Sequence, residues 1–394
     1  MIRILSLFSG MGAYEKALEK LGIEHEVINF CEINPFAAKA YSAIHKVPIE
    51  KNLKDVCEVD PNKIKDIDLM SWSFPCTSLS YAGKREGFET NQGERTASGL
   101  FYEGLRILKG VKPKYSIIEN VIPLIQKNFV KEFKIVLDSL NEAGYNTYWE
   151  VLNAKDFGIP QRRERVFLVS IRKDIDNHMF SFPIGTPLKK CLIDILEESV
   201  DEKYYLSDKM IKCVGKTPEG NSGFNARKYV NKSIASTLLT NIGCGRMHSD
   251  NYICEDLPLD FNWEDLEDFL INVNNEKILV RELVKSKYSV AEVGDSINTM
   301  RANRLGRGRI GHGIINTLLT SPEICAVVKE KQNIRLRKLT PKEAFRLMGF
   351  DDTDYQRAVD IGTSDTQLYK MAGNSVVVNV LEAILRNLLY QELK

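Results

Sequence analysis

Pro75 and Cys76 follow the apolar stretch IDLMSW after two intervening residues, a spacing that can place a thiol at a reactive position. An apolar run of this kind predicts a buried strand, and the proline stiffens the turn after it. In open α/β sheets ligands bind at the carboxyl ends of the strands, where a thiolate can act as a nucleophile. A cysteine that only packs in the core is the alternative. The residues after Cys76 are small and polar, then basic, which favours a loop that meets a polyanion.

A carboxylate and a run of arginines could join this cysteine. Glu119 follows the apolar stretch YSII, and partial burial there would raise its pKa and let it donate a proton. In the later stretch QRRER, strand alternation puts Gln161, Arg163 and Arg165 on one side. Each residue taken singly is commonplace. Together they predict a thiol, a carboxyl group and two guanidinium groups at one sheet edge.

A glycine-rich turn near the amino terminus predicts a cofactor site. Gly10 and Gly12 follow the first apolar run and open a helix, where a backbone can approach an anionic or polar ligand closely. Glu32 lies 20 residues beyond Gly12, where a ribose-binding carboxylate belongs in this topology. Glu15 stands where a dinucleotide fingerprint has its third glycine, which leaves other adenosine ligands open, S-adenosylmethionine first among them. A bare tight turn is the alternative.

The residues above must be positioned by secondary structure, and predicted strands and helices alternate along the first part of the chain. Such alternation implies an α/β domain with a doubly wound, mostly parallel sheet. The expected strands are 3–8, 26–31, 67–72, 115–118 and 166–171, and the expected helices are 14–21, 35–45, 100–108 and 129–143.

The alternation stops after about residue 183, and the following region mixes short strands, polar loops and glycine. We expect a second, smaller and irregular β-rich domain there. Its three related short segments are too few and unevenly spaced for a solenoid; they are 234–240, 297–300 and 315–320. Helices are expected again at 341–347 and 376–389.

The size and composition of the chain fit a globular protein of two domains. It has 394 residues, of which 43% are hydrophobic and 27% charged. No window approaches the roughly 20 apolar residues of a membrane span, and the amino terminus reads as a first strand, so we expect a cytoplasmic protein. Net charge is only +1, but 301–313 carries four arginines and no acid, whereas 255–268 carries seven acids and no base.

The eight cysteines predict neither a metal site nor a disulfide framework. None of them forms a CxxC pair, and the five histidines do not cluster with them. We therefore expect no metal, and most of these thiols to be small core residues.

The motifs taken in order resemble the DNA (cytosine-5)-methyltransferases of bacterial and phage restriction–modification systems. LFSGMG resembles the cofactor loop, CEIN the ribose-binding element, and NLKDV the adenine-binding turn. SFPCTSLS resembles the nucleophile loop, and IIENV and QRRER the segments that bind the base. RLRKLTPKEAFRLMGF resembles the motif that braces the small domain, and AGNSVVVNVLEAIL the last helix. The chain departs from the family pattern at Thr77, Ser6, Ala13 and Ile33, and none of these changes removes a catalytic group.

The resemblance implies the fold of S-adenosylmethionine-dependent methyltransferases and a division of labour along the chain. Residues 1–185 with 362–394 would form the catalytic and cofactor-binding domain, and 186–361 the small domain. The small domain would contain a target-recognition region at about 186–330 and a bracing motif at 335–350.

The resemblance also implies the reaction and the residues that perform it. Cys76 would add to carbon 6 of a cytosine, so that carbon 5 accepts the methyl group of S-adenosylmethionine and leaves S-adenosylhomocysteine. Glu119 would hold ring nitrogen 3 and the exocyclic amine, Arg165 would sit near the carbonyl oxygen of the base, and Arg163 would support the site. The expected cofactor contacts are Phe8, Ser9, Gly10, Gly12, Glu32, Ile33, Asp55, Val56, Pro75, Leu100, Asn374 and Ser375.

The expected partner is duplex DNA, from which the target base must be flipped. The glycine-interrupted arginines suit contacts to phosphates and guanine edges. The expected DNA contacts are Ser80, Arg85, Gln161, Arg304, Arg307, Arg309, Thr317 and Thr320. We expect a monomer that needs no membrane, and the sequence leaves open whether it is functionally paired with a cognate restriction endonuclease.

Four other readings compete with this one. An amino-methyltransferase would carry a Pro-Pro-aromatic motif where this chain has Pro75-Cys76, and a cysteine hydrolase would want a histidine in a motif with the thiol. A tRNA cytosine-5 methyltransferase would use the same chemistry, but the long region 186–330 suits the reading of a duplex. A catalytically dead DNA-binding protein would not need the intact set of Cys76, Glu119 and the two arginines.

Overall fold

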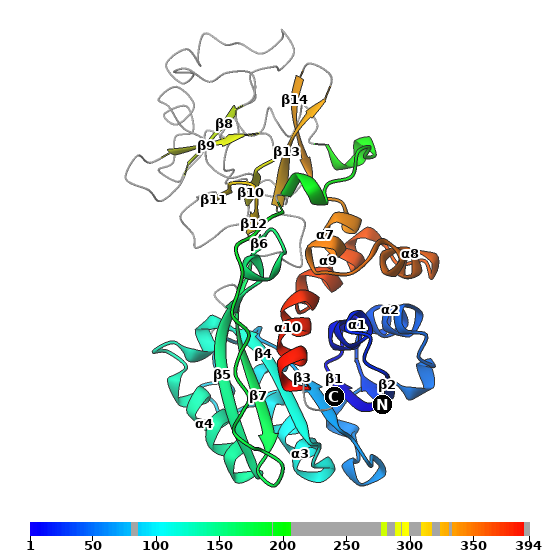
Figure 1. Cartoon of the computed structure of the whole chain (residues 1–394), viewed down its shortest axis with the longest axis vertical. Helices are drawn as coiled ribbons and strands as arrows, with labels where there is room; N and C mark the ends of the chain where they lie inside the picture. The colour runs from blue at the N-terminus through cyan, green and yellow to red at the C-terminus, as the bar shows by residue number, and fades with distance from the viewer. Residues whose placement is uncertain are drawn as a thin grey trace. The chain divides into compact units, whose positions relative to one another are not determined.

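The computed structural model describes residues 1–79, 86–190, 192–205, 277–281, 288–292, 294–298, 309–316, 324–330 and 333–389. The chain forms two compact units (Figure 1). The first contains Met1–Ile159, Arg163–Pro187 and Phe345–Lys394, and the second contains Pro160–Arg162 and Leu188–Ala344. The expected boundaries put 345–361 with the small domain, whereas these residues group with the first unit. The roles assigned to the two domains stay predictions.

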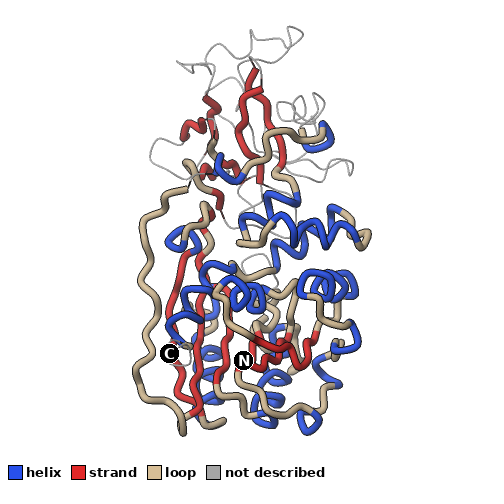
Figure 2. The backbone as a smooth tube through the Cα atoms, turned by 45° about the vertical axis from the view of Figure 1, so that its right-hand side comes forward, coloured by secondary structure: helices blue, strands red, loops and turns tan. Residues whose placement is uncertain are grey.

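A six-stranded sheet forms the centre of the first unit, with strand order β2-β1-β3-β4-β7-β5 (Figures 1 and 2). Five strands are parallel, and β7 runs antiparallel to both of its neighbours. The mostly parallel α/β sheet expected from the sequence is therefore confirmed. The strands are β1 (Ile2–Leu7), β2 (His25–Cys31), β3 (Leu69–Trp72), β4 (Tyr115–Val121), β5 (Tyr145–Asn153) and β7 (Glu164–Arg172).

Five of the seven helices that the structure describes in this unit begin and end close to the predicted residues. The seven are α1 (Ala13–Lys20), α2 (Pro35–His45), α3 (Phe101–Val111), α4 (Val130–Glu142), α8 (Asp352–Asp360), α9 (Asp365–Asn374) and α10 (Val378–Leu388). Helix α7 (Pro341–Leu347) spans the boundary between the units. Strand β5 and helices α8 and α9 were not among the predicted elements.

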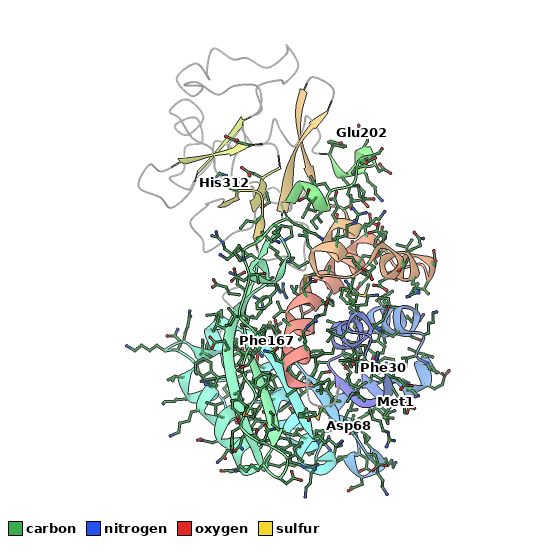
Figure 3. The ribbon with its side chains drawn as sticks, in the orientation of Figure 1. Met1, Phe30, Asp68, Phe167, Glu202 and His312 are labelled. Carbon is green, nitrogen blue, oxygen red and sulfur yellow. The ribbon has the colours of Figure 1, made fainter. Side chains whose placement is uncertain are left out.

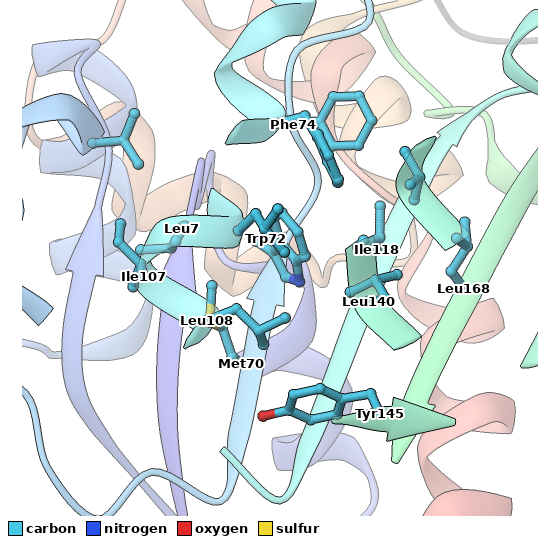
Figure 4. Close-up of a cluster of buried hydrophobic side chains, with 14 of the residues drawn as sticks. Leu7, Met70, Trp72, Phe74, Ile107, Leu108, Ile118, Leu140, Tyr145 and Leu168 are labelled. Atoms are coloured by element: carbon cyan, nitrogen blue, oxygen red, sulfur yellow. The ribbon is translucent and has the colours of Figure 1, made fainter. Parts of the chain in front are cut away.

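The main core packs α3 and α4 against one face of the sheet (Figure 4). Trp72 on β3 is fully buried, and its indole N–H donates to Ser116 Oγ at 2.6 Å. Helix α3 approaches Trp72 closely because Gly104 has no side chain, and an added Cβ there would overlap the indole ring. Phe30 on the edge strand β2 and Phe167 on β7 are also buried (Figure 3).

The described part of the second unit is built from short strands. A four-stranded sheet has the order β11-β10-β13-β14, and the strand pairs recorded within it are antiparallel. Strands β8 and β9 form an antiparallel pair, and β6 pairs with β12 in parallel. The strands are β6 (Gln161–Arg162), β8 (Lys277–Arg281), β9 (Tyr288–Glu292), β10 (Ser296–Asn298), β11 (Arg309–Gly311), β12 (Ile315–Asn316), β13 (Ile324–Glu330) and β14 (Asn333–Lys338).

Of the three related short segments of this region, two fall partly within described strands and one does not. Segment 234–240 lies outside the described residues, and parts of 297–300 and 315–320 fall in β10 and β12. No helix within the described ranges is long and apolar enough to span a membrane.

A buried lysine connects α1 to the chain near α8. The Lys16 ammonium lies 2.9 Å from Asp351 Oδ2, 2.9 Å from Asp354 Oδ2 and 3.1 Å from Glu19 Oε1. Its side chain is 3% exposed and that of Asp354 is 0% exposed. The Lys16 ammonium and the Asp354 carboxylate therefore neutralise each other at a place where neither is hydrated.

We predict that Lys16→Met lowers the free energy of unfolding by about 3 kcal/mol, because a buried carboxylate loses its cation. Urea unfolding measures the loss, and Lys39→Met on the exposed side of α2 is the matched control. The control should change stability by less than about 0.5 kcal/mol. A loss in Lys16→Met no larger than the control would show that this ion cluster does not hold α1 in place.

Candidate active site

The predicted reactive groups converge because of the direction of β7. Strands β3 and β4 are parallel, so their carboxyl ends meet at one edge of the sheet. β7 runs antiparallel to β4, with Arg165 opposite Val121 and Phe167 opposite Glu119. The amino end of β7 therefore lies beside the carboxyl end of β4. Arg163 and Arg165 thus lie at the same edge of the sheet as the segment that follows β3 and contains Cys76.

Cys76 begins a short turn that is anchored at both of its ends. The Cys76 carbonyl accepts the N–H of Leu79 at 2.9 Å, and the Ser78 N–H donates to Ser98 Oγ at 3.2 Å. The thiol is free and half-buried. Burial, followed by the nearby Glu119 carboxylate, raises the pKa of Cys76, whereas Arg165 and Arg163 lower it. The thiol thus lies within the electrostatic reach of all three predicted partners.

Glu119 and Arg165 form an ion pair beside that thiol. Arg165 Nε lies 3.0 Å from Glu119 Oε1, and the two side chains are 17% and 11% exposed. Arg165 is held further by the bond from its Nη1 to the carbonyl of Glu164, at 2.8 Å. Partial burial strengthens this pair and limits the positions that either side chain can adopt.

Arg163 connects the active-site edge to the carboxyl-terminal helices. Its Nη2 donates to the carbonyls of Gly373 at 3.2 Å and Ser375 at 2.7 Å, and its own N–H donates to Asn153 Oδ1 at 3.1 Å. Burial, together with Arg165, lowers the pKa of Arg163 to about 9, so the guanidinium is still charged at neutral pH. The carboxyl end of α9 is thus fixed to the candidate active site, together with two predicted cofactor contacts: Asn374, its last residue, and Ser375, which follows it.

The glycine turn has one crowded and one open position. Gly12 has φ 81°, and an added Cβ would overlap the His45 ring. Gly10 has φ 56°, and an added Cβ there would meet nothing within 4 Å. Gly12 is therefore required by packing under α1, whereas Gly10 leaves open space at the carboxyl end of β1.

The Glu32 carboxylate faces that open position. Its Oε2 accepts the N–H of Gly10 at 2.9 Å, and its Oε1 accepts the N–H of Asn34 at 2.8 Å. Asn52 holds the backbone of Glu32 by two further bonds of 3.0 Å each. Burial raises the pKa of Glu32, and the two backbone donors oppose this. The carboxylate is rigidly held, and each oxygen keeps a lone pair for another donor.

The other predicted cofactor residues differ in backbone geometry and in exposure. Phe8 has a left-handed backbone with φ 52°. The Asp55 side chain accepts the N–H of Cys57 at 2.9 Å and starts the short helical turn that contains Val56. Ile33 is 71% exposed. Among the remaining positions, Val56 and Ser375 are buried, Ser9, Pro75 and Leu100 are half-buried, and Asn374 is exposed.

Most predicted DNA contacts fall outside the described residues. Gln161 is fully buried in β6, where it is paired with Ile315 of β12, and Arg309 begins β11. The others lie beyond the described part of the chain; they are Ser80, Arg85, Arg304, Arg307, Thr317 and Thr320.

Three residues that sequence reasoning missed hold the predicted groups in place. The N–H of Glu119 donates to Ser73 Oγ at 3.1 Å, and Ser73 Oγ lies 3.2 Å from Tyr14 Oη. The Asn120 amide donates to the carbonyl of Phe74 at 3.2 Å. Ser73 lies three residues before Cys76 and Asn120 directly follows Glu119, but their type alone carries no signal for these bonds.

Comparison with solved structures places the fold among methyltransferases. The Entamoeba histolytica methyltransferase EhMeth superposes with a TM-score of 0.60 at 18% identity, covering 100% of this chain and 99% of that chain. The S. pombe Dnmt2 methyltransferase superposes with a TM-score of 0.54 at 18% identity, covering 100% and 99%. At these identities the likeness concerns the fold alone.

Comparison of sequences is more specific. The orphan methyltransferase M.SPRI of Bacillus phage SPR is 31% identical over 439 residues, covering 99% of this chain and 98% of that protein. The type II methyltransferase M2.ScrFI of Lactococcus lactis subsp. cremoris is 30% identical over 444 residues, covering 98% and 99%. The family model described as C-5 cytosine-specific DNA methylase matches residues 2–390. With the family model and these relatives extending over nearly all of its length, the chain belongs to the C-5 cytosine-specific DNA methylase family.

Proposed function

We propose that this protein methylates carbon 5 of a cytosine flipped out of a specific duplex DNA sequence, with S-adenosylmethionine as methyl donor and Cys76 as nucleophile. Membership of the family supports the reaction. The observation that carries the residue assignment is the sheet edge where Cys76 lies within reach of the Glu119–Arg165 ion pair.

Cys76 would make the cytosine ring reactive. Carbon 5 of cytosine is a poor nucleophile, and addition of a thiolate at carbon 6 converts the ring into an enamine whose carbon 5 can accept the methyl group. Loss of the carbon 5 proton then expels the cysteine. Burial and Glu119 keep the thiol protonated in the described structure, whereas Arg165 and Arg163 favour the thiolate. A substrate that engages the Glu119 carboxylate would tip this balance toward the thiolate.

Glu119 and Arg165 would bind opposite sides of the base. The carboxyl group suits ring nitrogen 3 and the exocyclic amine, and the guanidinium suits the carbonyl oxygen. Because these two side chains pair with each other in the described structure, the entering base would exchange part of that ion pair for its own contacts. The Cys76 turn and Arg163 would keep the surrounding backbone fixed during the exchange.

The glycine turn and Glu32 fit S-adenosylmethionine. The open space at Gly10 lets a ligand approach the backbone, and the anchored Glu32 carboxylate suits ribose hydroxyl groups. Asp55 suits the adenine amine, and the segment from Gly373 to Ser375 would close the methionine end. When bound, S-adenosylmethionine supplies an electrophilic methyl group, and S-adenosylhomocysteine is the product. No metal enters this scheme.

The second unit would read the DNA, and region 186–330 would determine the target sequence. Full-length relatives are named as orphan or type II methyltransferases of phages and bacteria. We propose that this chain likewise marks DNA, either alone or together with a cognate endonuclease. The description of the family, which names DNA, favours duplex DNA over tRNA as substrate.

We predict that expression of the protein in a host without cytosine methylation protects cytosines of one short DNA motif from bisulfite conversion. Cys76→Ser should abolish this protection, because an alcohol is far less ionised than a thiol at neutral pH. Residual methylation by Cys76→Ser within about tenfold of the parent would exclude Cys76 as nucleophile. Complete conversion in cells that contain soluble parent protein would contradict the DNA substrate, and a methyl-transfer assay on RNA would follow.

We predict that Glu119→Gln speeds alkylation of Cys76 by iodoacetamide at neutral pH. The Glu119 carboxylate raises the pKa of the thiol, so its removal lowers that pKa and increases the thiolate fraction. Arg165→Met should slow the reaction, because the guanidinium lowers the pKa. Mass spectrometry of the Cys76 peptide measures both rates, with the exposed Cys57 as internal reference. An upward shift of the pH midpoint in Glu119→Gln would contradict this electrostatic arrangement.

We predict that Gly10→Ala weakens binding of S-adenosylhomocysteine by about tenfold, because its methyl group enters the space left for the cofactor. Gly22→Ala is a matched control. Both glycines have left-handed backbones, at φ 56° and 66°, and an added Cβ meets nothing within 4 Å at either. Both variants should lose about 1–2 kcal/mol of stability through backbone strain. Equal affinities of the two variants in calorimetric titration would place the cofactor elsewhere.

A further inference from the structure

The sheet ladder ends just before Glu119. β3 and β4 are paired from Leu69 with Tyr115 to Ser71 with Ile117, and β3 ends at Trp72. The main chain then turns away toward Cys76, while β4 continues to Val121. The backbone N–H of Glu119 therefore lies beyond the last main-chain partner that β3 provides. A buried N–H without a partner would be costly at this position.

The side chain of Ser73 replaces the missing main-chain partner. Its Oγ accepts the N–H of Glu119 at 3.1 Å. The hydroxyl thus supplies one more hydrogen bond between this segment and β4, beyond the point where the backbone of β3 leaves the sheet. Ser73 belongs to the segment that carries Cys76, three residues later in the sequence. One bond thus joins the strand of the predicted carboxylate to the loop of the predicted nucleophile.

Tyr14 restricts the Ser73 hydroxyl to this position. The Tyr14 oxygen lies 3.2 Å from Ser73 Oγ, and Tyr14 is buried in α1, two residues after Gly12. Burial raises the pKa of the Tyr14 phenol, so the phenol keeps its proton at neutral pH. A serine oxygen can accept two hydrogen bonds, and a serine side chain otherwise rotates among three staggered positions. The second contact therefore selects the rotamer that meets Glu119.

We infer that Ser73 and Tyr14 are positioning residues that hold Glu119 against the Cys76 loop through the chain Tyr14 Oη, Ser73 Oγ, Glu119 N. This inference rests on the proposed function, because it assigns the two hydroxyl groups to the reaction in which Glu119 binds the base. Neither group needs to touch the substrate. Their loss would let the Glu119 backbone shift relative to the thiol, and misplacement of a reacting group slows the chemical step more than it weakens binding.

The test compares two variants that each remove one oxygen. Tyr14→Phe keeps the ring that fills the core, and Ser73→Ala removes the acceptor. Tyr145→Phe and Ser170→Ala are matched controls in the same unit, because each removes a buried hydroxyl that bonds to Pro113 or Thr147. Single-turnover methylation with saturating cofactor, the dissociation constant of S-adenosylhomocysteine, and the melting temperature are measured for all four.

We expect the single-turnover rate to fall about fivefold in Tyr14→Phe and about tenfold or more in Ser73→Ala, since one net hydrogen bond corresponds to about fivefold. The dissociation constant of the cofactor product should stay within about twofold of the parent in both. The double variant should be no slower than Ser73→Ala alone, because the two hydroxyl groups act in series. Ser73→Thr, which keeps a hydroxyl group, should recover most of the rate. The controls should keep the parental rate even where they melt earlier.

The outcomes separate this inference from the proposed function. The proposed function is tested before the positioning role. It is established if the parent protein methylates DNA and Cys76→Ser does not. Given that result, Tyr14→Phe and Ser73→Ala rates equal to those of the controls would overturn the positioning role alone. Rate losses that multiply in the double variant, or that follow the melting temperature across all four variants, would also overturn it, because they indicate independent or merely structural effects.

Discussion

The antiparallel insertion of β7 between β4 and β5 is the constraint on which the candidate site depends. In a fully parallel sheet the amino end of β7 would lie at the edge opposite Cys76, about six or seven residues of strand away. Because β7 is reversed, Arg165 lies opposite Val121 and its guanidinium reaches Glu119. The reversal also lets Arg163 hold the carbonyls of Gly373 and Ser375. One strand direction thus brings the predicted base-binding, nucleophilic and cofactor segments to a single edge.

The groups at this edge shift the pKa of the Cys76 thiol in opposite directions. Burial and Glu119 raise the pKa of Cys76, and the two arginines lower it. Arg165 is shared between the thiol and the carboxylate, so any ligand that takes over the carboxylate leaves the cationic influence on Cys76 stronger. An unreactive thiol in the free protein and a thiolate in the presence of a base are both consistent with this arrangement.

Much of the fold could be predicted from the sequence, because the buried parallel strands and the amphipathic helices have clear apolar patterns. Strand β5 was missed because it is the outermost strand of the sheet, next to β7, and the polar residues of YNTYWEVLN interrupt that pattern. The candidate site followed from motif residues such as Cys76 and Glu119. Its supporting bonds did not, because the contacts of Ser73 and Tyr14 join positions 59 residues apart and leave no periodic signal. Gln161 and Arg163 are both buried whereas Arg162 is exposed, which fits the predicted alternation, but the sequence could not tell that β12 would pair with Gln161.

The most direct test of the central claim is mass spectrometry of the protein after incubation with S-adenosylmethionine and duplex DNA that carries 5-fluorocytosine in its target motif. Fluorine at carbon 5 cannot leave as the proton does, so the addition product between the thiol and carbon 6 should persist. We expect a covalent nucleotide adduct on the peptide that contains Cys76, and no adduct in Cys76→Ser. An adduct on another residue, or none from a protein that methylates ordinary DNA, would contradict Cys76 as the nucleophile.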